Sequence, residues 1–119
     1  MRISILLPYK ENFSPNYAGA VSLFVNDITK ESIYRSSTFI FGNTDANLKL
    51  SKNYVNLNLK KKFFQSTSKL YINTFLEYHK KISTDLVEVH NRPNYINLIK
   101  KNFRNKLVLY FHNDPLTMN

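Results

Sequence analysis

Two short turns combine a histidine with amide and charged side chains, a mixture suited to binding sugar hydroxyls or phosphates. The residues are His90, Asn91 and Arg92 in the first turn, and His112, Asn113 and Asp114 in the second. An imidazole donates or accepts a hydrogen bond near neutral pH, and a guanidinium pairs with anions. Both turns are therefore candidate substrate-binding segments. In the first turn, helix capping by Asn91 and simple packing explain the same residues equally well.

A lone glycine, Gly19, opens a stretch with helical periodicity and is a third candidate for contact with a ligand. A residue without Cβ allows close approach to the backbone, and a helix N-terminus presents unpaired N–H groups to an anion. The surrounding residues 17–21 match neither Gly-x-Gly-x-x-Gly nor a Walker A loop. A Rossmann dinucleotide site is therefore disfavoured, and a tight turn at an ordinary helix start is the alternative.

The residue spacing gives no support to metal or nucleophilic catalysis. The chain has no Cys, and its three histidines form neither His-x-x-x-His nor His-Glu-x-x-His. No Gly-x-Ser-x-Gly elbow is present to hold a serine nucleophile. His79, which precedes Lys80 in a helical stretch, is expected at the surface because no partner for it is evident in the sequence. We therefore expect no metal and no cofactor.

The candidate turns lie between segments that alternate between strand and helix patterns. Strands are expected at 2–8, 37–41, 85–90 and 107–111, with a further short strand at 54–59, and helices beginning near residues 19, 63 and 93. On the first helix, the buried face is expected to carry Val21, Phe24, Val25 and Ile28. This order predicts an α/β, Rossmann-like fold, with a mostly parallel sheet, right-handed crossovers and flanking helices.

The predicted topology brings the three candidate segments to one edge of the sheet. In open α/β sheets, ligands bind beyond the carboxyl ends of the strands, near a switch in strand order. The loop that runs from Leu7 to Gly19 and the turns at His90 and His112 all follow predicted strands or open the next helix. His112 is the best placed of them, because it leaves a continuous apolar strand.

The composition describes one globular domain, or part of one, with a large excess of positive charge. Of 119 residues, 43% are hydrophobic, and 17 Lys and Arg against 8 Asp and Glu give a formal net charge of +9. Nucleic-acid binding is not expected, because the Tyr and Phe residues fall mostly on predicted buried faces. The run Lys60–Lys62 could attract anionic lipid head groups or an acidic acceptor, although a solvated basic loop explains it as well.

The first apolar run, Ile3–Leu7, is too short for a signal-peptide core or a membrane span. The expected location is therefore cytoplasmic. The positive charge would also allow peripheral contact with the anionic inner face of the membrane.

The order and spacing of these segments over the whole chain resemble the amino-terminal domain of family 4 glycosyltransferases, which have the two-domain GT-B fold. The matching segments are Ile3–Pro8, Gly19–Ser22, Glu88–Pro93 and Leu109–Pro115. The paired His-Asn-Arg-Pro and His-Asn-Asp-Pro turns are the most specific part, whereas Ala18-Gly19 stands where many members have Gly-Gly. The chain looks most like bacterial members that build lipopolysaccharide and other surface polysaccharides in cell-envelope biogenesis.

This resemblance implies a retaining enzyme that moves a sugar from a nucleotide-diphosphate donor to a hydroxyl of a polysaccharide or lipid-linked acceptor, usually without a metal. It implies that His112 contacts the donor sugar near the reacting centre, and that Gly19 lets the diphosphate or the sugar approach the first helix. His90, Asn91 and Arg92 would shape the acceptor side. The expected partners are a nucleotide sugar and a glycan or lipid-linked acceptor.

By the same resemblance, residues 1–119 form a partial acceptor-side domain, and the carboxy-terminal donor-binding domain is absent. We expect little or no transferase activity from this chain alone. The first alternative is a non-catalytic α/β binding module that acts with a separate donor-binding subunit. The second is a basic protein that binds nucleic acid or a membrane surface. A reading frame that continues past Asn119 would favour the glycosyltransferase over the binding module.

Overall fold

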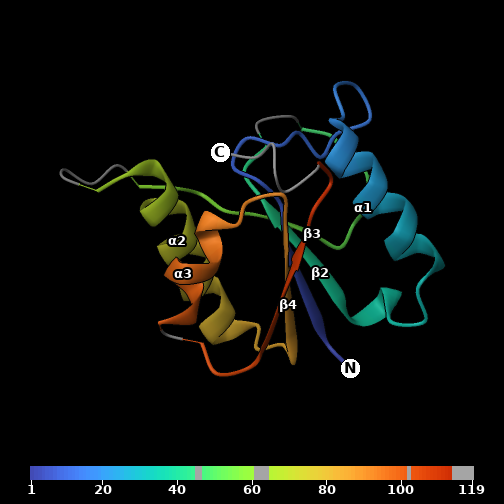
Figure 1. The fold of residues 1–119 in the computed structure, drawn as a ribbon. Helices are drawn as coiled ribbons and strands as arrows, with labels where there is room; N and C mark the ends of the chain where they lie inside the picture. The colour runs from blue at the N-terminus through green and yellow to red at the C-terminus, as the bar shows by residue number, and fades with distance from the viewer. Residues whose placement is uncertain (45–46, 61–64, 102, 114–119) are drawn as a thin grey trace.

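Five strands and three α-helices form an α/β fold in the computed structural model (Figure 1), which describes residues 1–44, 47–60, 65–101 and 103–113. In chain order the elements are β1 (Ile3–Leu6), α1 (Ala20–Glu31), the 3-10 helix η1 (Arg35–Ser37), β2 (Thr38–Gly42), β3 (Tyr54–Asn56), α2 (Thr67–Lys81), β4 (Leu86–His90), α3 (Asn94–Lys100) and β5 (Lys106–Tyr110).

The sheet has the strand order β3-β2-β1-β4-β5, and every neighbouring pair is parallel. Ser4 at the centre of β1 lies opposite Phe39 of β2 on one side and Val87 of β4 on the other. The chain builds outward from β1 to β3 and then returns to the other side of β1. This order confirms the predicted Rossmann-like fold and places the switch in strand order between β1 and β4.

The helices lie on both faces of the sheet. Figure 1 shows α1 on one side and the pair α2 and α3 on the other. Right-handed crossovers require this arrangement, because the chain moves in one direction from β1 to β2 and in the opposite direction from β3 to β5. Consecutive residues of β1 therefore point to different layers.

Two apolar cores fill the space between the sheet and its helices. Under α2 and α3, Leu6 and Phe41 pack with Tyr71, Phe75 and other buried side chains. Under α1, the core is smaller and consists of Ile5, Leu7, Phe13, Val21, Val25 and Ile40. Leu6 belongs to the first core and its two neighbours to the second, as the alternation of side chains along a strand requires.

Helix α1 is rotated relative to the face that the apolar spacing predicted. Its buried residues are Val21, Ser22, Val25 and Thr29, whereas Ile28 is exposed. Ser22 turns inward because its hydroxyl and its backbone N–H both bind the carboxylate of Glu11. The prediction that Ile28 is buried was therefore wrong, since a polar contact with the preceding loop orients the helix.

The second long helix begins later than predicted. Ser66 is the N-cap of α2, and its hydroxyl accepts a hydrogen bond from the backbone N–H of Lys69. The predicted start at residue 63 lies outside the described residues. The strand expected at 54–59 is shorter, and β3 ends at Asn56.

His79 is half-buried, and the expectation of a surface position without a partner was wrong. Its Nε2 lies 3.3 Å from the backbone nitrogen of Thr84, which donates to it, and 3.2 Å from the hydroxyl of the same residue. Its ring also contacts the rings of Phe75 and Phe103. Burial lowers the pKa of His79, while the contact with Thr84 opposes that shift.

Strand β5 lies at an edge of the sheet, and its side that faces the α1 layer is poorly covered. Val108 is 43% exposed and Tyr110 is 39% exposed.

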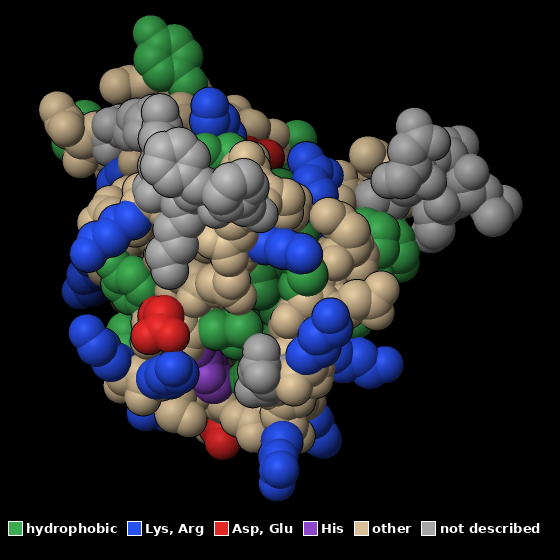
Figure 2. All heavy atoms as spheres, turned by 90° about the vertical axis from the view of Figure 1, so that its left-hand side faces the viewer, with side chains coloured by type: hydrophobic (Ala, Val, Ile, Leu, Met, Phe, Trp, Pro, Cys, Tyr) green, Lys and Arg blue, Asp and Glu red, His purple; other side chains and the backbone are tan. Residues whose placement is uncertain are grey.

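Figure 2 shows Lys and Arg side chains spread over the face of the molecule that carries α2 and α3, without a single dense patch. No helix within the described residues has the length and apolar character needed to cross a bilayer.

Candidate functional site

The carboxyl ends of β1, β4 and β5 bring the predicted site segments together. The loop after β1, the turn after His90 and the turn that holds His112 all lie at this edge. Helix α1 joins them, because the ring of Phe24 lies 5.0 Å from the ring of His112, nearly at right angles to it. The predicted gathering of these segments along one edge is present in the fold.

His90 ends β4 and is fully buried between two polar partners. Its Nε2 lies 3.0 Å from Oε1 of Glu88, and its Nδ1 lies 2.8 Å from Nε2 of His112. A carboxylate only accepts hydrogen bonds, so Nε2 of His90 donates to Glu88. In a neutral His90, Nδ1 is then the acceptor, and Nε2 of His112 must donate to it. The three side chains form a directed chain that ends at Nδ1 of His112.

His112 is held in place by its backbone and by neighbouring rings. Its N–H donates to Oδ1 of Asn91 over 3.3 Å. Its ring also lies 5.1 Å from that of His90 and 5.0 Å from that of Tyr110. No hydrogen bond to Nδ1 of His112 is found within residues 1–113 as far as they are described. Among the described residues, this nitrogen is therefore available to a ligand.

The environment of His112 favours its neutral form. Burial lowers its pKa, the neighbouring His90 lowers it further, and the carboxylate of Glu11 acts in the opposite direction. A neutral imidazole whose Nε2 donates to His90 presents a lone pair at Nδ1. His112 can therefore accept a hydrogen bond from a hydroxyl near neutral pH.

Asn91 shapes the turn and does not cap the following helix. Its φ is 58°, in the left-handed region, which asparagine tolerates better than most residues. Its N–H donates to the carbonyl of Tyr110 over 2.8 Å, and its side chain binds the backbone of His112. The N-cap of α3 is Pro93. The capping role considered for Asn91 was therefore wrong, and this residue instead ties the two predicted turns together.

Arg92 is half-buried and is engaged with its own turn. Its Nη1 donates to the carbonyl of Asn91 over 2.8 Å. The remaining N–H groups of the guanidinium leave capacity for an anion. Among the other predicted residues, Asn113 is described and exposed, whereas Asp114 lies outside the described residues.

Two tyrosines from the opposite helical layer fix the loop that follows β1. The hydroxyl of Tyr71 donates to the carbonyl of Leu7 over 2.6 Å, and the hydroxyl of Tyr95 accepts from the N–H of Tyr9 over 3.1 Å. Both phenols have a raised pKa because of burial, which keeps them neutral. These two hydrogen bonds therefore fix the start of the loop after β1, at the switch in strand order between β1 and β4.

Gly19 leaves room for the side chain of Glu11, a residue of the same chain. The backbone of Gly19 has φ −75°, which any residue adopts, so conformational freedom is not the reason for glycine. A Cβ at this position would overlap the carboxylate of Glu11. Oε2 of Glu11 accepts from the hydroxyl of Ser22 over 2.9 Å and from its N–H over 3.4 Å. The start of α1 thus binds an anion, but this anion is the carboxylate of Glu11 and not the ligand that the sequence analysis considered.

Sequence reasoning missed two carboxylates of this site, Glu11 and Glu88. Glu88 had a usable signal, because it precedes His90 by two residues on the same strand and therefore shares its face. Glu11 had none, because it lies in an irregular loop whose path depends on tertiary contacts. Within the described residues, no group of three or more His, Asp or Glu side chains could hold a metal ion.

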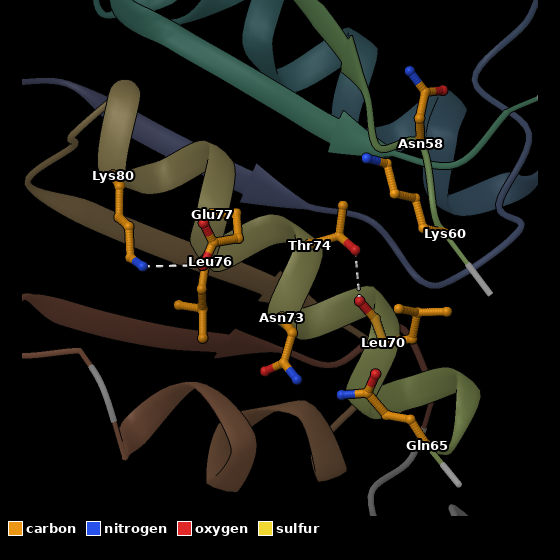
Figure 3. Close-up of a pocket in the computed structure, with 9 residues that line it drawn as sticks. All are labelled: Asn58, Lys60, Gln65, Leu70, Asn73, Thr74, Leu76, Glu77 and Lys80. Carbon is orange, nitrogen blue, oxygen red and sulfur yellow. Dashed lines mark hydrogen bonds and ion pairs between the residues drawn. The ribbon is translucent and has the colours of Figure 1, made fainter. Parts of the chain in front are cut away.

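A large hollow lies away from this edge site. It has a volume of about 800 Å³ and lies beside α2, lined by Asn73, Glu77 and Lys80 of this helix and by Asn58 and Lys60 of the segment after β3 (Figure 3). Lys80 is paired with Glu77 over 3.0 Å. Lys60 is the described end of the predicted basic run, and Lys61 and Lys62 lie outside the described residues. None of the predicted histidines or their partners lines this hollow.

Comparison with known proteins gives no relative for this chain. No protein-family profile, no curated protein and no solved structure matches it.

Proposed function

We propose that this chain is the amino-terminal, acceptor-side part of a retaining glycosyltransferase of the family 4 type. The enzyme would move a sugar from a nucleotide-diphosphate donor to a hydroxyl of a polysaccharide or lipid-linked acceptor in cell-envelope biogenesis. Its place of action would be the cytoplasm or the inner face of the membrane. The observation that carries the proposal is the hydrogen-bonded chain of Glu88, His90 and His112 at the carboxyl edge of the sheet.

The position of the three hydrogen-bonded residues Glu88, His90 and His112 supports sugar handling. They lie at the carboxyl ends of β4 and β5, next to the switch in strand order between β1 and β4, and open α/β sheets bind their ligands near such a switch. His90 is fully buried, so its role is to connect Glu88 to His112, while Nδ1 of His112 has no hydrogen bond to any residue that the structure describes. A hydroxyl of a sugar is a suitable partner for that nitrogen, because it can donate to a neutral imidazole.

The electrostatics of the three residues suit the charge changes of sugar transfer. The bond between the anomeric carbon and the diphosphate oxygen breaks, and its electron pair leaves with the diphosphate. The acceptor oxygen bonds to the same carbon, on the face from which the diphosphate departs, and its proton passes to the oxygen of the departing diphosphate. Positive charge develops on the sugar ring during this exchange. A neutral His112 backed through His90 by the negative charge of Glu88 stabilises a cationic sugar better than an imidazolium would.

The start of α1 is the proposed contact with the donor. The N–H and the hydroxyl of Ser22 now bind the carboxylate of Glu11 there. A diphosphate or a sugar that approaches Gly19 would have to displace this carboxylate, because both occupy the same space. Glu11 would then act as a placeholder that keeps the site polar before substrate binds.

A second candidate function is a binding module that acts with a separate donor-binding subunit. The poorly covered side of β5 favours a contact with a further folded unit, since Val108, Tyr110 and Phe111 present apolar surface there. The unit could be a later part of the same chain or a different protein. In both cases the nucleotide would be bound by residues other than 1–119.

The test of this function is a sugar-transfer assay across common nucleotide sugars, with this chain joined to or mixed with its donor-binding half. His112→Ala should lower kcat by about 10²-fold or more, the size of effect seen when a group that stabilises transition-state charge is removed. His79→Gln is the matched control and should keep kcat within about twofold, because His79 lies in the other layer. Absence of transfer with every donor, or an unchanged kcat in His112→Ala, would refute the proposal.

A further inference from the structure

A second hollow lies at the opposite end of the sheet, beside the amino end of β2. It has a volume of about 410 Å³ and is bounded by the last turns of α1, by η1 and by the turn before β3. In Figure 1 these segments lie toward the end of the molecule that carries the N-terminus, away from the carboxyl edge. The residues that matter for its chemistry are Thr29, Lys30, Arg35, Ser51, Lys52 and Asn53. We call it the basic pocket.

The charges around the basic pocket are all positive. Lys30, Arg35 and Lys52 contribute three cations, and no Asp or Glu is among the residues that line it. Lys30 has a long contact of 3.6 Å with Asp27, and both side chains of this pair are largely exposed. The side chain of Lys52 has no hydrogen bond or ion pair with any residue in the described ranges. Arg35 donates through Nη1 to the carbonyl of Ser32 over 3.3 Å and keeps its other N–H groups for a ligand.

Neutral donors complete the pocket and fix its shape. Nδ2 of Asn53 donates to the carbonyl of Arg35 over 2.6 Å, which holds the turn before β3 against η1. The hydroxyl of Ser51 accepts from the N–H of Asn53 and so keeps its own proton to donate. The hydroxyl of Thr29 is buried and has no hydrogen-bond partner among the described residues. A buried hydroxyl without a partner is unusual in a folded protein, and a ligand in the basic pocket could form a hydrogen bond with it.

We propose that the basic pocket binds a phosphate group. Three cations with hydroxyl and amide donors, and no carboxylate among the lining residues, match an anion that accepts several hydrogen bonds at once. The volume exceeds that of a single phosphate, so the phosphate would be carried on a larger molecule. This site is separate from the carboxyl edge and does not depend on the glycosyltransferase proposal.

Two sources of phosphate fit this chemistry. One is a soluble phosphate ester, which the pocket would hold alone. The other is a phospholipid head group, because Ile33 is 82% exposed between α1 and η1, and Met1 is 59% exposed next to η1, where its carbonyl accepts from Ser37. Exposed apolar side chains beside a phosphate site can enter the surface of a bilayer.

The experiment uses the whole chain labelled with ¹⁵N and follows its backbone amides. The titrants are glycerol 3-phosphate at constant ionic strength, neutral phosphatidylcholine vesicles and vesicles that also contain phosphatidylglycerol. The test variant replaces Arg35 and Lys52 by Gln. The control variant replaces Lys69 and Lys100, two exposed lysines on α2 and α3, by Gln and has the same net charge.

The proposal expects saturable binding of glycerol 3-phosphate or of the anionic vesicles, with shifts centred on residues 29–36 and 51–53. The test variant should weaken this binding by about tenfold or more, and the control variant by less than about twofold. Binding of the soluble ester identifies a soluble ligand, and binding of anionic vesicles alone identifies a lipid head group. Absence of saturable binding to both, or an equal loss in the control variant, would overturn the proposal.

Discussion

Nδ1 of His90 lies 2.8 Å from Nε2 of His112, so two histidines that are 22 positions apart share a hydrogen bond at the carboxyl edge of the sheet. The register of β4 and β5 brings them together, because His90 lies opposite Tyr110. Glu88 continues the contact on the same face of β4. The parallel sheet thereby assembles a three-residue polar chain from two short turns.

The hydrogen bond between the two histidines should be measurable as a coupling in stability. His90→Phe and His112→Ala each remove one partner, and the double variant removes both. We expect the free energies of unfolding to be non-additive by about 1 kcal/mol, the net contribution of a hydrogen bond. Urea unfolding of the four proteins measures the coupling. Additive effects within error would show that the bond contributes nothing in solution.

The two histidines with lowered pKa should make the protein less stable in mild acid. The pKa of His112 and of His79 lies below the ordinary value of 6.5, mainly because of burial. The folded state therefore binds fewer protons than the unfolded state once the pH falls below that value. The stabilisation is fully present above about pH 6.5 and is lost as the pH falls through 6.5 toward the folded pKa values.

A variant with Gln at positions 79 and 112 tests this dependence. Its free energy of unfolding should change less between pH 7 and pH 5 than that of the unmodified chain. The comparison removes the contribution of all other groups, because they are common to both proteins. Equal slopes in the two proteins would contradict the assignment.

Gly19→Ala should destabilise the protein, although alanine is the better helix former. The new Cβ overlaps the carboxylate of Glu11 and displaces it from the N–H and hydroxyl of Ser22. Loss of this cap should lower the free energy of unfolding by about 1 kcal/mol. In a Glu11→Ala background the same substitution should be nearly neutral, since no carboxylate remains to be displaced. A loss of equal size in both backgrounds, measured by urea unfolding, would argue against the cap.

Two small hydroxyl residues on α1 should respond in opposite ways to removal of the hydroxyl. Thr29 is buried and its hydroxyl has no partner among the described residues, so Thr29→Val should leave stability unchanged or raise it. Ser22→Ala is the matched change, and it should lower the free energy of unfolding by about 1 kcal/mol because the Ser22 hydroxyl binds Glu11. Thermal melting compares the two. A clear loss in Thr29→Val would mean that its hydroxyl is satisfied by an ordered water in solution.

The strands that bury both faces were predictable from the sequence, and the details of the edge were not. The apolar run Ile3–Leu7 predicts β1, the segment 85–90 predicts β4, and the alternation with helices predicts the parallel order. The orientation of α1 was not predictable, because the contact of Ser22 with Glu11 overrides the apolar spacing that includes Ile28. A periodic pattern contains no information about a carboxylate that arrives from an irregular loop.

The candidate site was predictable in place but not in its internal contacts. The switch in strand order predicts where His90 and His112 meet. The left-handed backbone of Asn91 depends on the turn geometry and converts an expected helix cap into a link between two strands. His79 gained partners because Thr84 and Phe103 approach it only in the folded chain.

The most direct test of a sugar-handling edge is the behaviour of the histidine rings themselves. The chain is labelled with ¹⁵N at histidine and titrated with nucleotide sugars and with glycan acceptors, and the ring signals of His112 and His79 are followed by NMR. The proposal predicts that at least one of these ligands shifts the His112 signals in a saturable way and leaves those of His79 in place. Unchanged His112 signals with every ligand, or equal shifts of both rings, would contradict it.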